Sequence, residues 1–153
     1  EDMQRELADG FTALARLTDP QASLTELRQS TLYRWTEYEE RLSWLDQSAK
    51  ATRAGLAERG PDFVAAHSLI EAHYFRNACF LEPDQLITHA SKLAGVPMQI
   101  LHSRYDMVCP PHGALRLAAA CPHAGLHMVP VNGHAMTDQV QTVLNDVMAG
   151  VLP

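Results

Sequence analysis

The sequence predicts an α/β fold in its second half and an all-helical region before it. Apolar runs at 98–102 and 127–131 are each followed by a segment with helical spacing, at 113–120 and 137–149. Two consecutive strand–helix units are typical of a parallel sheet with flanking helices. Before Leu81, apolar residues instead recur at helical spacing. We therefore predict an α/β protein whose sheet follows a helical region.

The helical region contains residues that mark where its helices begin and break. Leu7 to Leu17 and Leu24 to Leu42 form two apolar stripes at helical spacing. Ser23 to Glu26 has the form of a capping box, which predicts a helix start there. Gly60-Pro61 predicts a break, with a further helix running toward Phe75. The expected division is a helical region over 1–80 and an α/β region over 81–153.

Two parallel strands alone make a poor sheet, because such strands are normally buried on both faces. The chain also opens at Glu1 without an initiator Met. We therefore expect a fragment whose neighbouring strands come from a missing N-terminal half of the same fold.

Composition excludes several partners. The 153 residues are 46% hydrophobic and carry a net charge of −6, with scattered basic residues, which disfavours nucleic acid as a partner. The three cysteines have no C-x-x-C spacing, and the histidines show no H-E-x-x-H or comparable pattern, so no metal site and no cofactor are predicted. No run approaches the roughly 18 apolar residues of a membrane span. A cytoplasmic location and no membrane partner are expected.

Asp106 and His134 each follow one of the predicted strands, in the turn after its end. An acid followed by a histidine is the order of an α/β-hydrolase triad, in which the carboxylate orients the base and the base activates a serine. The serine is missing, because no G-x-S-x-G occurs in the chain. Asp106 alone would equally fit a turn-forming or helix-capping Asp.

Four blocks of sequence carry a resemblance to a known family. Ile70–Phe75 reads I-E-A-H-Y-F, Leu81–Leu86 reads L-E-P-D-Q-L, Arg104–Pro110 reads R-Y-D-M-V-C-P, and Gly133 precedes His134. In order and spacing these blocks resemble the proline iminopeptidase (prolyl aminopeptidase) family of α/β-hydrolases. The resemblance implies that the chain is the C-terminal part of an α/β-hydrolase, preceded by most of its all-helical cap.

The resemblance also implies roles for individual residues. Asp106 and His134 would be the acid and base of the triad, and Cys109 would border the substrate pocket. Glu71 and Glu39 would bind the substrate's ammonium, because two carboxylates balance a partly desolvated cation that neutral acceptors would leave underpaired. Phe75 would line the pocket of the proline ring.

Simpler interpretations stay open for these residues. Glu71 and Glu39 could face solvent on their helices, Phe75 could pack in the core, and Cys109 could be buried and inert. Because Trp35 to Glu39 matches its family block only loosely, Glu37 or Glu40 could replace Glu39. Two further departures are Ala72, where the family has Asn, and Ser103, where it has Gly.

The expected function is a serine-type aminopeptidase that releases N-terminal proline from small peptides. The fragment lacks the nucleophile, so it should be inactive without the missing half. Two alternatives remain: a related cap-bearing hydrolase that acts on other amides or esters, and a non-catalytic remnant or subunit that pairs with a separate N-terminal half.

Overall fold

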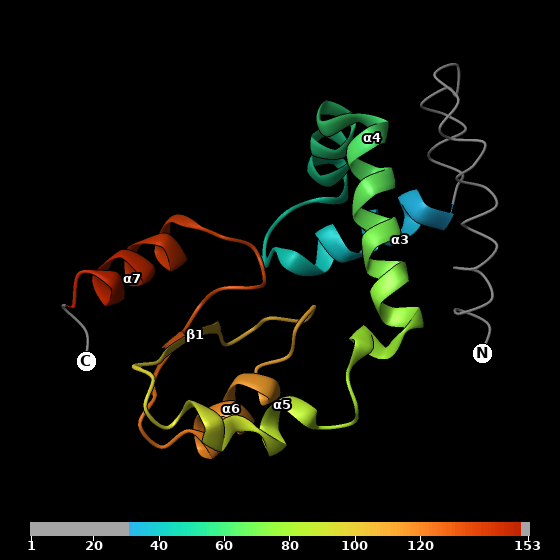
Figure 1. Ribbon diagram of the computed structural model, residues 1–153. Coiled ribbons are helices and arrows are strands. Elements are labelled where there is room, and N and C mark those ends of the chain that lie inside the picture. Colours follow the sequence, from blue (N-terminus) through green and yellow to red (C-terminus); the bar gives the residue numbers. More distant parts are fainter. Residues whose placement is uncertain (1–30, 151–153) are drawn as a thin grey trace. The chain divides into compact units, whose positions relative to one another are not determined.

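The computed structural model describes residues 31–150, which form two compact units. Within that range, unit 1 comprises 31–41 and 47–81, and unit 2 comprises 42–46 and 82–150. Figure 1 traces the described elements by colour along the chain. The stripe at Leu7 and the capping box at Ser23 lie outside the described residues. Whether unit 1 acts as a cap stays a prediction.

Unit 1 is built on two helices, α3 (Thr31–Ser43) and α4 (Ala49–Arg76). The Ser48 side chain accepts a hydrogen bond from the Ala51 backbone N–H and so caps the start of α4. Gly60 breaks α4 with φ +82°, a conformation that glycine adopts without the steric cost of a Cβ. The predicted break at Gly60-Pro61 is therefore confirmed.

The interior of unit 1 joins an apolar cluster to a buried polar network. Tyr33, Leu56 and Val64 form the cluster. The hydroxyls of Thr36 on α3 and Ser68 on α4 are fully buried and lie 2.6 Å apart. Both lie within hydrogen-bond distance of the Leu32 carbonyl oxygen. This network fixes the register between the two helices, because each buried hydroxyl would otherwise lack a partner.

Unit 2 contains two parallel strands, β1 (Gln99–Ser103) and β2 (Gly125–Val129), paired from Gln99 with Gly125 to Ser103 with Val129. The helix α6 (His112–Ala120) connects them, and α7 (Asp138–Met148) follows β2. Before β1 come three short segments: η1 (Ala78–Phe80), which belongs to unit 1, and α5 (Gln85–Thr88) and η2 (Ala90–Leu93) of unit 2.

The predicted α/β architecture is confirmed, with small shifts in the strands. β1 begins one residue later than expected, and β2 begins two residues earlier, at Gly125. The first residues of β2 are a glycine and a leucine after a turn, and it is their pairing with β1 that makes them strand residues. Thr137 caps α7 by accepting from the Val140 N–H.

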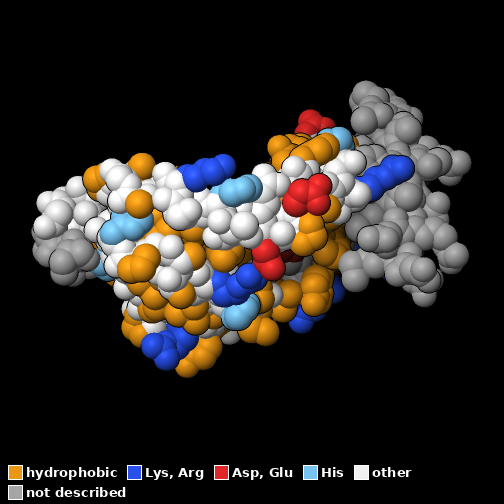
Figure 2. Space-filling model, turned by 60° about the horizontal axis from the view of Figure 1, so that its bottom comes forward, with side chains coloured by type: hydrophobic (Ala, Val, Ile, Leu, Met, Phe, Trp, Pro, Cys, Tyr) orange, Lys and Arg blue, Asp and Glu red, His pale blue; other side chains and the backbone are white. Residues whose placement is uncertain are grey.

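The sheet is less buried than parallel strands usually are. Of the ten strand residues, only Ser103 and Val129 are buried. Large hydrophobic side chains are also exposed, and Figure 2 shows hydrophobic groups spread over one face of the chain. In unit 2 the exposed ones include Leu86, Val96, Tyr105, Met107, Leu115, Val131, Met136 and Met148. Such surface is characteristic of a domain that packs against further protein.

No helix among residues 31–150 has the length and apolar character that crossing a membrane requires.

Candidate active site

Asp106 lies in the turn after β1, and both oxygens of its buried carboxyl group have partners. Oδ1 accepts hydrogen bonds from the backbone N–H groups of Val108, at 3.0 Å, and Cys109, at 2.7 Å. Oδ2 faces the ring of His134. The turn-forming interpretation of Asp106 is thus correct as far as Oδ1 is concerned, and it leaves the second oxygen for the histidine.

His134 lies in the loop after β2, with its Nδ1 3.0 Å from Oδ2 of Asp106. Its side chain is 42% exposed, whereas that of Asp106 is 6% exposed. A hydrogen bond from Nδ1–H to the carboxylate leaves the lone pair of the neutral imidazole on Nε2. Among residues 31–150 no hydrogen bond reaches that Nε2. The two predicted triad residues therefore converge, with a basic nitrogen directed away from the acid.

Asn132 holds the loop that carries His134, a role that the sequence did not suggest. Its buried side-chain Nδ2 lies within hydrogen-bond distance of Ser103 Oγ and of the carbonyls of Gly133 and Ala135, at 2.7–3.0 Å. Its Oδ1 accepts from the Thr137 hydroxyl at 2.6 Å. Because Asn-Gly is a common turn sequence, nothing in the sequence distinguishes Asn132 from an ordinary turn residue. Ser103, a departure from the family, is thereby one of the partners of Asn132.

Gly133 is required by a close approach of the backbone. A Cβ at this position would lie 2.5 Å from the Ser43 carbonyl oxygen. The same carbonyl accepts a hydrogen bond from the Ala135 N–H at 2.9 Å. Any side chain at 133 would displace this contact and with it the neighbouring His134.

His102 braces the turn after Asp106 from β1. Its Nε2 lies 2.9 Å from the Cys109 carbonyl oxygen and 3.7 Å from Oδ2 of Asp106. Cys109 is exposed, so the interpretation of this residue as a buried inert cysteine is wrong. Its predicted place at the border of a pocket stays a prediction.

In unit 1, a hydrogen bond from the Trp35 side chain orients Glu71. Trp35 Nε1 donates to Glu71 Oε2 at 2.8 Å, across α3 and α4. The Trp35 ring meets Phe75 edge-on, with ring centroids 6.3 Å apart. Phe75 is 52% exposed, so it does not pack in the core. Glu71 and Phe75 thus lie on the face of α4 that contacts Trp35 of α3.

The structure distinguishes Glu39 from its two alternatives. Glu37 pairs with Arg53 at 2.7 Å and Glu40 with Arg59 at 2.6 Å. Glu39 instead lies in a cluster with Glu71 whose ligand atoms are all within 4.8 Å of one another. Both of the predicted ammonium-binding carboxylates therefore meet on one face of unit 1. Ala72 is buried and adds no polar group there.

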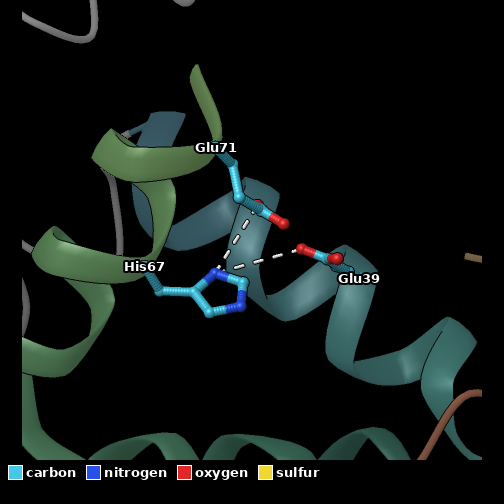
Figure 3. Close-up of side chains that lie close together, drawn as sticks. All are labelled: Glu39, His67 and Glu71. Carbon is cyan, nitrogen blue, oxygen red and sulfur yellow. Dashed lines mark ion pairs between the residues drawn. The ribbon is translucent and has the colours of Figure 1, made fainter. Parts of the chain in front are cut away.

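The third member of that cluster is His67, a residue outside the four sequence blocks that carry the family resemblance. Figure 3 shows its ring facing both carboxylates, with Glu39 on α3 and His67 and Glu71 on α4. The i,i+4 spacing of His67 and Glu71 places them on one helix face, and that spacing was the available signal.

Across the described chain, an acid and a histidine meet where two parallel strands end, in an α/β unit. This is the arrangement that hydrolases with a nucleophile–histidine–acid triad use.

Known sequences identify the family. The chain is 42% identical over 80 residues to a proline iminopeptidase of Xylella fastidiosa, a match that covers 52% of this chain and 26% of the relative. It is 45% identical over 74 residues to that of Xanthomonas citri, covering 48% and 24%. A probable proline iminopeptidase of Leptolyngbya boryana is 36% identical over 126 residues, covering 80% and 37%. No protein family model matches the chain.

Over the stretches covered by these matches, the chain belongs to the proline iminopeptidase family. It spans only about a quarter to a little over a third of the length of these relatives.

Proposed function

We propose that this chain is the C-terminal part of a serine-type aminopeptidase with an α/β-hydrolase fold, which releases N-terminal proline from small peptides. The observation that carries the proposal is the 3.0 Å pair between His134 Nδ1 and Asp106 Oδ2 at the ends of two parallel strands. In the mechanism, His134 Nε2 accepts the proton of the serine hydroxyl as it attacks the scissile carbonyl. It then returns that proton to the leaving amine.

Asp106 supports this proton transfer without taking the proton itself. Its carboxylate fixes the His134 tautomer through Nδ1 and stabilises the imidazolium that forms. The two backbone N–H groups on Oδ1 keep the carboxylate from rotating away from the ring. His102 and Asn132 support the two loops, so the pair is preorganised before substrate binds.

Glu39 and Glu71 supply the specificity for an N-terminal proline. The secondary ammonium of such a substrate has two N–H donors and one positive charge, which two carboxylates can satisfy together. Phe75 offers a flat apolar wall for the pyrrolidine ring, and its exposure leaves that wall open to a ligand. Both carboxylates are largely shielded from solvent, at 15% and 23% exposed.

The missing half of the fold would supply the nucleophile, the oxyanion-hole amides and the remaining strands. The partial burial of β1 and β2 supports this arrangement, because further parallel strands and their helices would cover the exposed strand residues. Without that half, the chain would not hydrolyse peptides by this mechanism.

The test measures release of the chromophore from a proline anilide by the protein that carries this chain together with its nucleophile. Glu71→Gln keeps the shape of the side chain but removes its charge. We expect kcat/KM to fall about ten- to a hundredfold, the value of one hydrogen bond to a charged group. Glu58→Gln, an exposed glutamate on the same helix, is the matched control and should change nothing.

An unchanged kcat/KM in Glu71→Gln, or activity on neutral esters alone, would contradict the aminopeptidase and favour another cap-bearing hydrolase. Absence of any hydrolysis in the parent protein would instead indicate a non-catalytic remnant.

A further inference from the structure

In the Glu39–His67–Glu71 cluster the histidine forms ion pairs with both carboxylates at distances too long for hydrogen bonds. His67 Nδ1 lies 3.5 Å from Glu71 Oε2 and 4.0 Å from Glu39 Oε2. These separations exceed the 2.7–2.9 Å or so of a charge-assisted hydrogen bond. Figure 3 shows the His67 ring nitrogen facing both carboxylates, with dashed lines for the two ion pairs.

The same separations suit a metal ion. With zinc–ligand bonds of about 2.0–2.1 Å, two ligands of a tetrahedral site lie roughly 3.3–3.4 Å apart. The distance from His67 to Glu71 is already close to that edge, and the one to Glu39 would need only a small side-chain rotation. All three ligand atoms lie within 4.8 Å of one another.

A second observation is that His67 Nδ1 lacks a hydrogen bond within the described part of the chain. This nitrogen is buried and has no hydrogen-bond partner among residues 31–150. A buried ring nitrogen without a partner costs free energy, and a metal ion would satisfy it. Glu71 is also prepared as a ligand, because Trp35 donates to its Oε2 and orients the carboxylate. Such outer hydrogen bonds are typical of ligating carboxylates.

We propose that Glu39, His67 and Glu71 bind a divalent transition metal, with Zn²⁺ the preferred ion. One imidazole and two carboxylates suit zinc, whereas Mg²⁺ and Ca²⁺ prefer oxygen ligands alone. Three protein ligands leave the fourth position of the ion for water. The spacing along the chain links only His67 to Glu71, and the third ligand, Glu39, comes from another helix.

Bound zinc would occupy the two carboxylates assigned above to the substrate ammonium. Zinc should therefore compete with proline substrates and act as an inhibitor, a consequence that rests on the proposed function. Binding of the metal itself does not depend on that function.

The experiment titrates Zn²⁺ into the purified metal-free protein that carries this chain, by isothermal calorimetry, with Mg²⁺ as a comparison ion. His67→Ala should weaken zinc binding at least about tenfold, since even loss of an outer partner costs that much. His73→Ala, on the same helix but outside the cluster, is the matched control and should bind zinc like the wild type. Far-ultraviolet circular dichroism checks folding, and His67→Gln replaces His67→Ala if the alanine variant unfolds.

Zinc binding that weakens in the His67 variant but not in His73→Ala supports the site. Absence of zinc binding, equal weakening in both variants, or no weakening in either would overturn it. Inhibition of proline anilide release by Zn²⁺ is measured separately. Zinc bound through His67 without inhibition would keep the metal site and contradict the ammonium role of the two glutamates.

Discussion

The two units of this chain hold their charged groups in opposite ways. In unit 2 both oxygens of Asp106 have close partners, at 2.7–3.0 Å. In unit 1 the His67 nitrogen faces Glu71 and Glu39 across 3.5 and 4.0 Å. In the first arrangement both carboxylate oxygens of Asp106 already have hydrogen-bond partners, one of which is His134. The second leaves room for a cation between its members.

On the proposed function, the two units have different roles: unit 2 transfers the proton and unit 1 binds the substrate ammonium. A base that moves a proton has to be held rigidly, so unit 2 surrounds its acid with backbone donors and buried polar side chains. On the proposed function, a site that recognises a charged group has to keep its carboxylates available, and Trp35 donates to only one oxygen of Glu71. Substitutions in unit 2 should therefore change kcat, whereas those at the carboxylates of unit 1 should change substrate recognition.

The largest effect is expected at the acid of unit 2. Asp106→Asn keeps the size of the side chain but favours the wrong tautomer of His134, so kcat should fall about 10⁴-fold. Steady-state kinetics of proline anilide hydrolysis by the full-length protein measure this. A loss below tenfold would show that the pair does not form the acid–base centre.

Asn132→Ala should have the next largest effect. It releases the loop of His134 from Ser103 and from two carbonyls, and a misplacement of the base by about 1 Å costs about a hundredfold in kcat. KM should change little, because the side-chain hydrogen bonds of Asn132 are all made within unit 2. Asn145→Ala on α7 is the control, and equal losses in the two variants would refute a positioning role.

Trp35→Phe should have a smaller effect, confined to recognition. The indole N–H on Glu71 is lost while the aromatic contact with Phe75 is kept, so KM for proline anilide should rise about two- to tenfold. A change of kcat at constant KM would contradict the different roles of the two units. Initial rates over a range of substrate concentrations separate the two outcomes.

Ser68→Ala should affect stability and not activity. It leaves the buried Thr36 hydroxyl with one partner fewer, which should lower the free energy of unfolding by about 1–2 kcal/mol. Urea denaturation measures the change, with Ser91→Ala, an exposed serine of unit 2, as the control. Equal stability of wild type and Ser68→Ala would show that the network does not join α3 to α4.

The elements that the sequence predicted are those with strong local signals. The strands, the break at Gly60 and the helices after each strand follow from periodicity and turn residues, and Asp106 and His134 follow from strand ends that parallel pairing brings together. What was missed depends on contacts between distant segments. Asn132, in the loop after β2, gains its importance from Ser103 at the end of β1, and His67 gains its importance from Glu39 on another helix.

The strand register shows the same limit. β2 begins at Gly125 because its residues pair with β1, and no property of Gly125 itself indicates a strand.

The most direct test of the division between the units compares two substrates and two variants of the full-length protein. The substrates are a proline anilide and a neutral ester of the same ring size without the ammonium, and the variants are His134→Ala and Glu71→Gln. The account predicts that His134→Ala abolishes hydrolysis of both substrates, whereas Glu71→Gln lowers kcat/KM for the anilide alone. Equal losses on both substrates in Glu71→Gln would contradict it.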